Sequence, residues 1–179
     1  YEDAMDEYVL AKQRVAFEEI YLHKHEFLKT VEKFNKKKSF ELTINKESMD
    51  IFYSSLPFSL TSGQISAINK ISNSIRDKRP SKVLIQGDVG CGKTIVAIIA
   101  CYQALKNNHQ CLVLVPTEVL CSQHFKTFTE HLGNYGMVEM ISGKNTKAEK
   151  ESIKRKLYDG QISILIGTHA LLFNDYKFR

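Results

Sequence analysis

Apolar side chains recur at three-and-four spacing over the first 36 residues, the pattern of an amphipathic helix. No glycine or proline interrupts residues 4–36, so we predict one continuous helix there, about 50 Å long at 1.5 Å per residue. Such a helix needs something to lie against, and a connector between two domains is one form of that packing role. Next, Phe40, Leu42 and Ile44 alternate as in a short edge strand.

A second, shorter helix is predicted from about residue 46 to 55. It ends before Pro57 because the residue that precedes a proline is pushed out of the helical region. We place a domain boundary near residue 50, which divides the chain into a helical connector, 1–50, and a larger domain, 51–179.

From residue 82 onward, apolar runs alternate with amphipathic stretches. The runs predict strands that are buried on both faces, and the stretches predict the helices between them. The predicted strands are 82–86, 110–116, 137–141 and 162–167, and the predicted helices are 93–106, 117–132 and 146–160. This alternation indicates an α/β fold with a parallel sheet covered by helices on both faces.

The phosphate loop, residues 87–94, carries the strongest chemical signal. Its sequence GDVGCGKT fits G-x-x-x-x-G-K-[ST] at every fixed position. The backbone N–H groups of such a loop form an anion nest, and the next helix adds the positive end of its dipole. We expect Lys93 to meet the β- and γ-phosphates of ATP and the Thr94 hydroxyl to ligate Mg²⁺, both with catalytic roles. The predicted nucleotide-binding residues here are Gly87, Asp88, Val89, Gly90, Cys91, Gly92, Lys93 and Thr94.

Hydrolysis needs a further carboxylate, at the end of another strand, to hold the Mg²⁺, and a group that orients the attacking water. The expected pattern is an apolar strand that ends in Asp, often followed by Glu. No Asp-Glu pair follows the phosphate loop, and Asp175 comes after Asn174 in a stretch too short for a central strand. We therefore expect the chain alone to bind nucleotide and to be inactive in hydrolysis.

Composition narrows the class of protein without defining a function. The chain is 43% hydrophobic and 25% charged, as globular proteins are, and no apolar run reaches the roughly 18 residues of a membrane helix. The net charge of +5 permits an anionic partner without requiring one. Cysteines 91, 101, 111 and 121 fit no metal-ligand spacing, which favours free thiols in a reducing compartment. Because the chain does not begin with Met, we expect a piece of a longer polypeptide.

Five stretches, in this order, resemble the RecG family of bacterial superfamily 2 DNA helicases and translocases. They are AFEEIYLHK (16–24), LPFSLTSGQ (56–64), QGDVGCGKT (86–94), LVPTEVLCSQHF (114–125) and ILIGTHALL (164–172). The third and fifth are also typical of the transcription-repair coupling factor, whereas the other three favour RecG. Cys91 and Cys121 depart from the pattern, since such proteins often have a smaller residue there. The resemblance implies a RecA-like first motor lobe over 51–179, truncated before the Asp-Glu box, and a connector from an upstream wedge domain.

The resemblance also implies roles for single residues. Gln64 is similar to the glutamine that reads the adenine edge, with Phe58 as a stacking partner, but residues 61–64 also fit a T-x-x-Q capping box. Pro116, Thr117 and Glu118 open a stretch that grips the DNA backbone in this family, and a simple helix N-cap explains Thr117 equally well. Further DNA-contacting residues are implied near the carboxyl ends of strands, where plain turns are the alternative: Gln123, His124, Ser142, Gly143, Thr168 and His169.

By this resemblance the parent protein is a monomeric, ATP- and Mg²⁺-dependent helicase that remodels stalled forks and Holliday junctions in recombination and repair. It would work in the bacterial cytoplasm, at the nucleoid and not at a membrane. Its partners would be branched DNA, gripped by the phosphate backbone, and the wedge domain and second motor lobe of the same chain. The motor lobe of a coupling factor, a P-loop kinase or nucleotide-binding module without a DNA role, and an interaction scaffold remain alternatives. The kinase does not need the PTE and GTH stretches, and the scaffold does not need Lys93 and Thr94.

Overall fold

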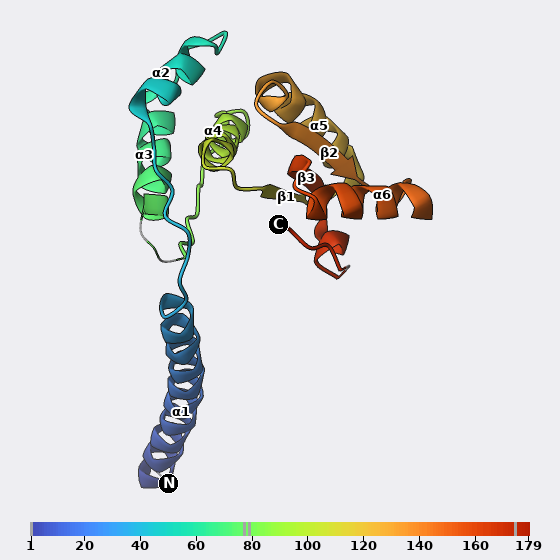
Figure 1. Cartoon of the computed structure of the whole chain (residues 1–179). Coiled ribbons are helices and arrows are strands. Elements are labelled where there is room, and N and C mark those ends of the chain that lie inside the picture. The colour runs from blue at the N-terminus through green and yellow to red at the C-terminus, as the bar shows by residue number, and fades with distance from the viewer. Residues whose placement is uncertain (1, 77, 79, 174) are drawn as a thin grey trace. The chain divides into compact units, whose positions relative to one another are not determined.

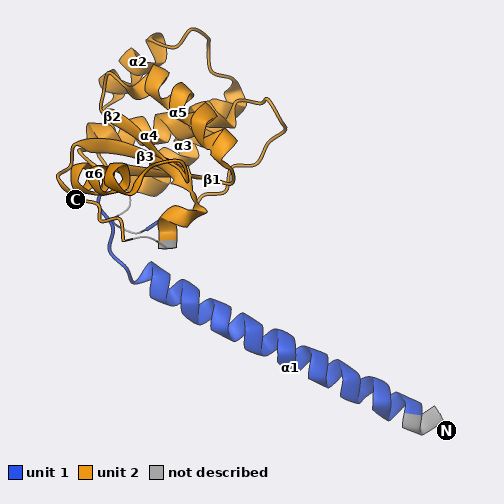
Figure 2. Ribbon diagram, turned by 90° about the vertical axis from the view of Figure 1, so that its right-hand side faces the viewer, with its two compact units in different colours: residues 1–41, 77–82 blue, residues 42–76, 83–179 orange. Residues whose placement is uncertain are grey.

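The protein forms two compact units in a computed structural model that describes residues 2–76, 78, 80–173 and 175–179. Figure 2 distinguishes the first unit, residues 1–41 and 77–82, from the second unit, residues 42–76 and 83–179. Asn174, which separates Asp175 from the preceding apolar residues, lies outside the described part. No helix among the described residues is long and apolar enough to cross a membrane.

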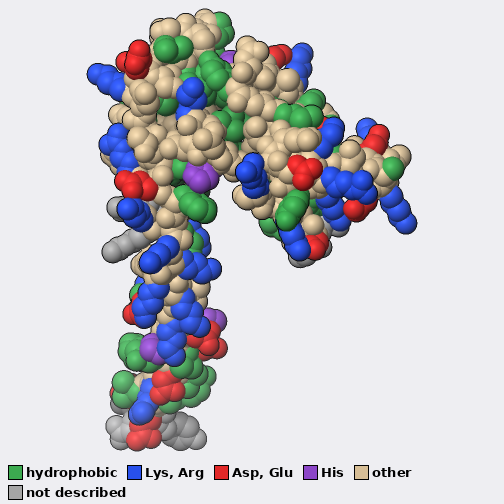
Figure 3. All heavy atoms as spheres, in the orientation of Figure 1, with side chains coloured by type: hydrophobic (Ala, Val, Ile, Leu, Met, Phe, Trp, Pro, Cys, Tyr) green, Lys and Arg blue, Asp and Glu red, His purple; other side chains and the backbone are tan. Residues whose placement is uncertain are grey.

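The first unit is dominated by helix α1 (Glu2–Asn35), which confirms the predicted long helix. Exposed aromatic and charged side chains support it locally: the Tyr21 ring stacks with those of Phe17 and His25, and Arg14 pairs with Glu18 at 3.2 Å. Figure 3 shows hydrophobic, acidic and basic side chains interspersed on the visible face of α1. Most of its apolar side chains are exposed, and only Val31 and Phe34 among those described are half-buried.

The predicted edge strand at Phe40, Leu42 and Ile44 is wrong, because the described residues 36–45 form no strand. In the second unit, the Leu42 N–H donates to the carbonyl of Ile75, near the end of a helix. The Asn107 side-chain amide accepts from the Thr43 N–H at 2.8 Å and donates to the Thr43 carbonyl at 2.9 Å. Hydrogen bonds with the Asn107 side chain and the Ile75 carbonyl thus replace those that a neighbouring strand would make.

Helices α2 (Lys46–Ser54) and α3 (Ser62–Arg76) belong to the second unit. Asn45 begins α2 as its N-cap by accepting from the Ser48 N–H, and Met49 and Phe52 bury their side chains in the core. The division between units falls after residue 41, whereas the boundary that we placed near residue 50 lies inside α2. Burial of Met49 and Phe52 is the physical reason that α2 goes with the second unit.

The sheet consists of three parallel strands in the order β1-β3-β2. The strands are β1 (Cys111–Val115), β2 (Met137–Ile141) and β3 (Ile162–Thr168), and the helices that alternate with them are α4 (Lys93–Lys106), α5 (Glu118–Leu132) and α6 (Lys147–Tyr158), followed by the 3-10 helix η1 (His169–Phe173). Figure 1 shows this arrangement. The predicted α/β class is confirmed, and α4 and β2 have the predicted bounds.

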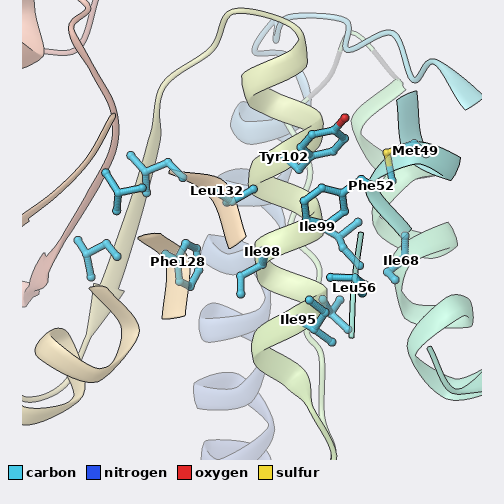
Figure 4. Close-up of a cluster of buried hydrophobic side chains, with 14 of the residues drawn as sticks. Met49, Phe52, Leu56, Ile68, Ile95, Ile98, Ile99, Tyr102, Phe128 and Leu132 are labelled. Atoms are coloured by element: carbon cyan, nitrogen blue, oxygen red, sulfur yellow. The ribbon is translucent and has the colours of Figure 1, made fainter. Parts of the chain in front are cut away.

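Two hydrophobic clusters cover β3, one on each face. The larger one contains Ile164 and Ile166 of β3 with side chains of α2 to α5, and the smaller one contains Leu165 with side chains of α6 and η1. Figure 4 shows the α4 side chains in the middle of the larger cluster, between those of α5 and those of α2 and α3. There Phe52 stacks on Tyr102 at 4.3 Å between ring centroids. Each fully buried Leu, Ile or Phe contributes about 1.5–3 kcal/mol, so β3 is firmly held.

The first predicted strand is also wrong: residues 82–86, all of them described, form no strand. A strand needs a neighbour for its backbone hydrogen bonds. The sheet of the described residues contains β1, β3 and β2, and residues 82–86 pair with none of these strands. Leu84 is consequently 85% exposed, although the apolar run that contains it is typical of a buried strand. The segment that leads into the phosphate loop therefore has no support from the sheet.

Candidate functional site

Two glycines of the phosphate loop adopt a backbone conformation that other residues rarely take. Gly90 and Gly92 both have a φ of +80°, in the left-handed region. Helix α4 begins directly afterwards, at Lys93, so the N–H groups of its first turn face the loop. This is the geometry that the motif predicts, with a helix N-terminus behind a tight turn.

The Lys93 ammonium group lies against the backbone of the phosphate loop. Its Nζ atom donates to the carbonyl of Gly87 at 2.8 Å and to that of Asp88 at 2.6 Å, and lies 3.6 Å from the Cys91 sulfur. A phosphate that binds in the loop must therefore replace these carbonyls as the acceptor for Lys93. The side chain is already held within the loop, which lowers the entropy lost on binding.

Gln64 joins helix α3 to the phosphate loop. Its Oε1 atom accepts from the Thr61 N–H at 2.9 Å while its own N–H donates to the Thr61 hydroxyl, so the capping-box interpretation is confirmed. Its Nε2 atom donates to the Cys91 carbonyl at 3.1 Å. A Cβ atom at position 92 would collide with Gln64 Nε2, which is a second reason for Gly92. The adenine contact of Gln64 stays a prediction.

A cavity of about 200 Å³ lies between Gln64 and the phosphate loop. Pockets for whole small molecules usually measure about 300–1,000 Å³, so this one suits a phosphate tail better than a complete nucleotide. Its lining residues are Thr61, Gly63, Gln64, Ala67, Ile85, Gln86, Cys91, Gly92, Lys93 and Val96. The structure thus brings Gln64 and Lys93 together. Phe58 instead lines a separate cavity of about 720 Å³, beside Tyr53 and Pro57.

The Mg²⁺ ligands available at this site are few. Thr94 is half-buried at the start of α4, and its role as a ligand stays a prediction. Among the described side chains, no three His, Cys, Asp or Glu residues cluster closely enough to hold a metal ion. Asp175 is exposed and lies 4.0 Å from Lys177. The lack of a second metal-binding carboxylate stays a prediction.

The carboxyl edge of the sheet, defined here as residues 116–118, 142–146, 168 and 169, is where the three strands end. The register places Val115 beside Thr168 and Ile141 beside Gly167, so the segments that follow are neighbours. Thr117 caps α5 by accepting from the Leu120 N–H at 3.3 Å, which confirms the N-cap interpretation. Four predicted residues therefore meet at this edge: Thr117, Ser142, Gly143 and Thr168. Their contact with DNA is an untested prediction.

The other predicted DNA-binding residues lie in different places. Gln123 and His124 lie along α5, about 8 Å or more from its first residue at 1.5 Å per residue. The His124 ring packs edge-on against Phe128, with centroids 6.1 Å apart. His169 is exposed and begins η1, directly after Thr168. The edge thus includes His169 but neither of the two α5 residues.

Glu118, which the resemblance placed only as part of a DNA-gripping stretch, joins two parts of the carboxyl edge. Its Oε1 atom accepts from the Gly143 N–H at 2.6 Å. Asn145 closes the same turn by accepting from the Ser142 N–H at 2.8 Å, and Thr146 forms a capping box with Glu149 that starts α6. The hydrogen bonds from Thr146 lower the pKa of Glu149. An acidic residue in the first turn of a helix, after a strand, was the available signal for Glu118.

All four cysteines are free thiols. The hydrogen bond with Cys111 and burial raise the pKa of Cys101 well above its usual value. Burial, followed by the charge of Glu118, raises the pKa of Cys121, whose thiol lies 3.9 Å from the Ile141 carbonyl. Cys101 and Cys121 are therefore protonated at neutral pH and pack as small apolar side chains.

A parallel α/β sheet and a glycine-rich phosphate loop at a helix N-terminus together define a P-loop nucleotide-binding domain. The model of the DEAD/DEAH box helicase family matches residues 61–178. The chain therefore belongs to this family. The match decides against the small P-loop kinase.

Individual relatives refine the comparison. RecG of Aquifex aeolicus is 36% identical over 171 residues, which cover 95% of this chain and 22% of that protein. A solved structure of RecG bound to a three-way DNA junction matches with a TM-score of 0.83 at 36% identity, over 93% of this chain and 23% of that one. The transcription-repair-coupling factor of Rickettsia conorii is 39% identical over 94% of this chain and 15% of that protein. The predicted resemblance is confirmed: this is a RecG-like helicase domain that spans about a fifth of the RecG relatives.

Proposed function

We propose that this chain is the nucleotide-binding first motor lobe of an ATP-dependent helicase that remodels branched DNA, such as stalled forks and Holliday junctions. The observation that carries the proposal is the phosphate loop, with Gly90 and Gly92 in the left-handed region and the Lys93 ammonium already inside the loop. Branched DNA as the substrate is supported by the RecG relative whose structure contains a three-way junction.

The side chains of the site have separate tasks. Lys93 exchanges the carbonyls of Gly87 and Asp88 for phosphate oxygens, and so compensates the charge of the nucleotide. The Thr94 hydroxyl would hold Mg²⁺, which neutralises charge on the β- and γ-phosphates when it is bound. Gln64 holds the loop through the Cys91 carbonyl, and it would exchange this hydrogen bond for the adenine edge, with Phe58 as the stacking partner.

DNA would bind at the carboxyl edge. Hydroxyl and N–H groups of Thr117, Ser142, Gly143 and Thr168 suit phosphate and sugar oxygens, so binding should not depend on base sequence. Gln123, His124 and His169 would extend the same contact along α5 and η1. Only a few phosphates are neutralised by one lobe, so affinity should fall gently with salt.

Completion of the active site would require a second lobe. The carboxylate that finishes the metal shell would come from outside these residues, and an arginine from a partner lobe is worth about 10³ to 10⁵ in rate. This dependence would couple closure of the cleft between two lobes to movement along DNA. The partners would therefore be a wedge domain and a second motor lobe of the same protein, acting in the bacterial cytoplasm.

A coupling-factor motor lobe is the second candidate, because the Rickettsia relative is 39% identical. The two functions differ in what the motor displaces. The test is an assay of the full-length protein with ATP on a three-way junction and on a stalled RNA polymerase complex. We expect junction unwinding without release of the polymerase. Release without unwinding would favour the coupling factor, and failure of both would reject the helicase proposal.

A further inference from the structure

One side chain links two separate segments of the carboxyl edge. Glu118 lies in the first turn of α5, beside the N-cap Thr117, and Gly143 lies in the turn that follows β2. The Glu118 carboxylate accepts from the Gly143 N–H at 2.6 Å, although 25 residues separate the two in sequence. This hydrogen bond therefore fixes the distance between the start of α5 and the turn at 142–146.

The backbone at Gly143 is adapted to this contact. A Cβ atom at position 143 would lie 2.6 Å from Glu118 Oε1, so a side chain there would displace the carboxylate from its present position. A weaker contact lies alongside, where the buried Cys121 thiol points to the Ile141 carbonyl at 3.9 Å. Two positions about one turn apart on α5 thus contact the end of β2 and the turn that follows it.

The charge of Glu118 runs against the proposed use of this edge. A carboxylate repels the phosphates that Thr117, Ser142 and Gly143 would contact. A carboxylate in the first turn of a helix also interacts favourably with the helix dipole, and that effect needs no partner at Gly143. The short hydrogen bond and the missing Cβ atom instead point to the acceptor oxygen as the feature that matters.

We propose that Glu118 is a positioning residue for DNA: it sets the spacing between Thr117 and the turn at 142–144 so that both reach the same DNA backbone. This inference rests on the proposed DNA-binding role of the edge. It implies that the carbonyl oxygen of a glutamine can replace the carboxylate, because glutamine keeps the acceptor for the Gly143 N–H and loses the charge.

The test is the junction-stimulated ATPase of the full-length protein, measured as the DNA concentration for half-maximal rate. For Glu118→Ala we expect this concentration to rise roughly three- to tenfold, since a charge-assisted hydrogen bond is lost. Glu118→Gln should stay within about twofold of the wild type or bind DNA more tightly, given its retained acceptor. The KM for ATP should not change in either variant, because Glu118 is not part of the phosphate loop.

Gly143→Ala provides an independent variant. Its methyl group displaces the carboxylate but leaves the 143 N–H in place, so it should reproduce the effect of Glu118→Ala. The double variant should be no worse than either single variant, as expected for residues that act through one contact. The thermal midpoint of each protein is measured so that only folded variants are compared.

The outcomes separate this inference from the proposed function. No stimulation of the wild type by junction DNA would reject the DNA-binding role itself, and with it the inference. A stimulated wild type with equal losses for Glu118→Ala and Glu118→Gln would show that the charge matters and would overturn the positioning role alone. Wild-type behaviour of both Glu118→Ala and Gly143→Ala would overturn it as well.

Discussion

The phosphate loop and the carboxyl edge are built in opposite ways. In the loop, the chemistry is contained in eight consecutive residues, and Lys93 bonds to carbonyls five and six positions before it. The preceding segment at 82–86 has no strand partner among the described residues, so the sheet does not support the loop from that side. At the edge, three distant segments meet at the ends of a buried sheet, but their hydroxyl and N–H groups are chemically ordinary.

This difference separates chemical specificity from structural support. A contiguous motif can define a ligand site even where the flanking structure is weak, since its glycines and lysine act over a few bonds. An assembled edge depends on strand register and on contacts such as the one between Glu118 and Gly143. Substitutions in the phosphate loop should therefore reduce nucleotide binding more than stability. Substitutions in the sheet beneath the carboxyl edge should mainly reduce stability.

The largest effect is expected from the sheet beneath the edge. Leu165 is fully buried in β3, so Leu165→Ala should lower the free energy of unfolding by about 2–5 kcal/mol. Leu84→Ala, in the exposed segment before the loop, should change it by less than about 0.5 kcal/mol. Urea unfolding of the 179-residue chain measures both. Equal losses would mean that residues 82–86 are packed like a strand, which would remove the contrast.

The next effect concerns the chemistry of the loop. Lys93→Ala should weaken ATP binding by at least about tenfold and leave adenosine binding unchanged, because the ammonium acts on phosphate. Lys70→Ala, which removes an exposed lysine of α3, is the control and should bind both ligands as the wild type does. Titration calorimetry gives the constants. Equal losses for ATP and adenosine would place Lys93 outside the phosphate site.

A smaller effect distinguishes the two left-handed glycines. Gly90→Ala and Gly92→Ala both force alanine to a φ of +80°, which costs about 1–3 kcal/mol, but only the second adds a collision with Gln64. Gly92→Ala should therefore be the more destabilising, and Gln64→Ala should restore part of its loss. Thermal unfolding of the single and double variants checks this order. Equal destabilisation by both would show that Gln64 does not press on the loop.

The smallest effect is expected at Thr117, the N-cap of α5 at the carboxyl edge. Thr117→Ala should lower stability by about 0.5–2 kcal/mol, whereas Thr117→Ser keeps the hydroxyl that accepts from the Leu120 N–H. If Thr117 also contacts DNA, the serine variant should retain junction-stimulated ATPase in the full-length protein. Full DNA affinity in the alanine variant would leave Thr117 with the capping role only.

How far the sequence predicts this structure depends on whether the determinant is local. Hydrophobic periodicity and the glycine motif depend on neighbouring residues, which is why the sequence predicts the bounds of α4 and β2 and the tight turn at Gly90 and Gly92. Residues 82–86 have the composition of a buried strand, but a strand also needs a partner, and an apolar run does not specify one. Likewise, nothing near Glu118 in sequence indicates Gly143, because strand register brings them together.

The most direct test of the central claim is phosphate release by the 179-residue chain, compared with the full-length protein, each with and without a three-way DNA junction. The account predicts that the chain binds ATP but releases phosphate at the background rate with or without DNA, whereas the full-length protein is stimulated by the junction and loses its activity in Lys93→Ala. DNA-stimulated turnover by the chain alone would contradict the account. A catalytic carboxylate would then lie within these residues, and Asp175 would be the first to substitute.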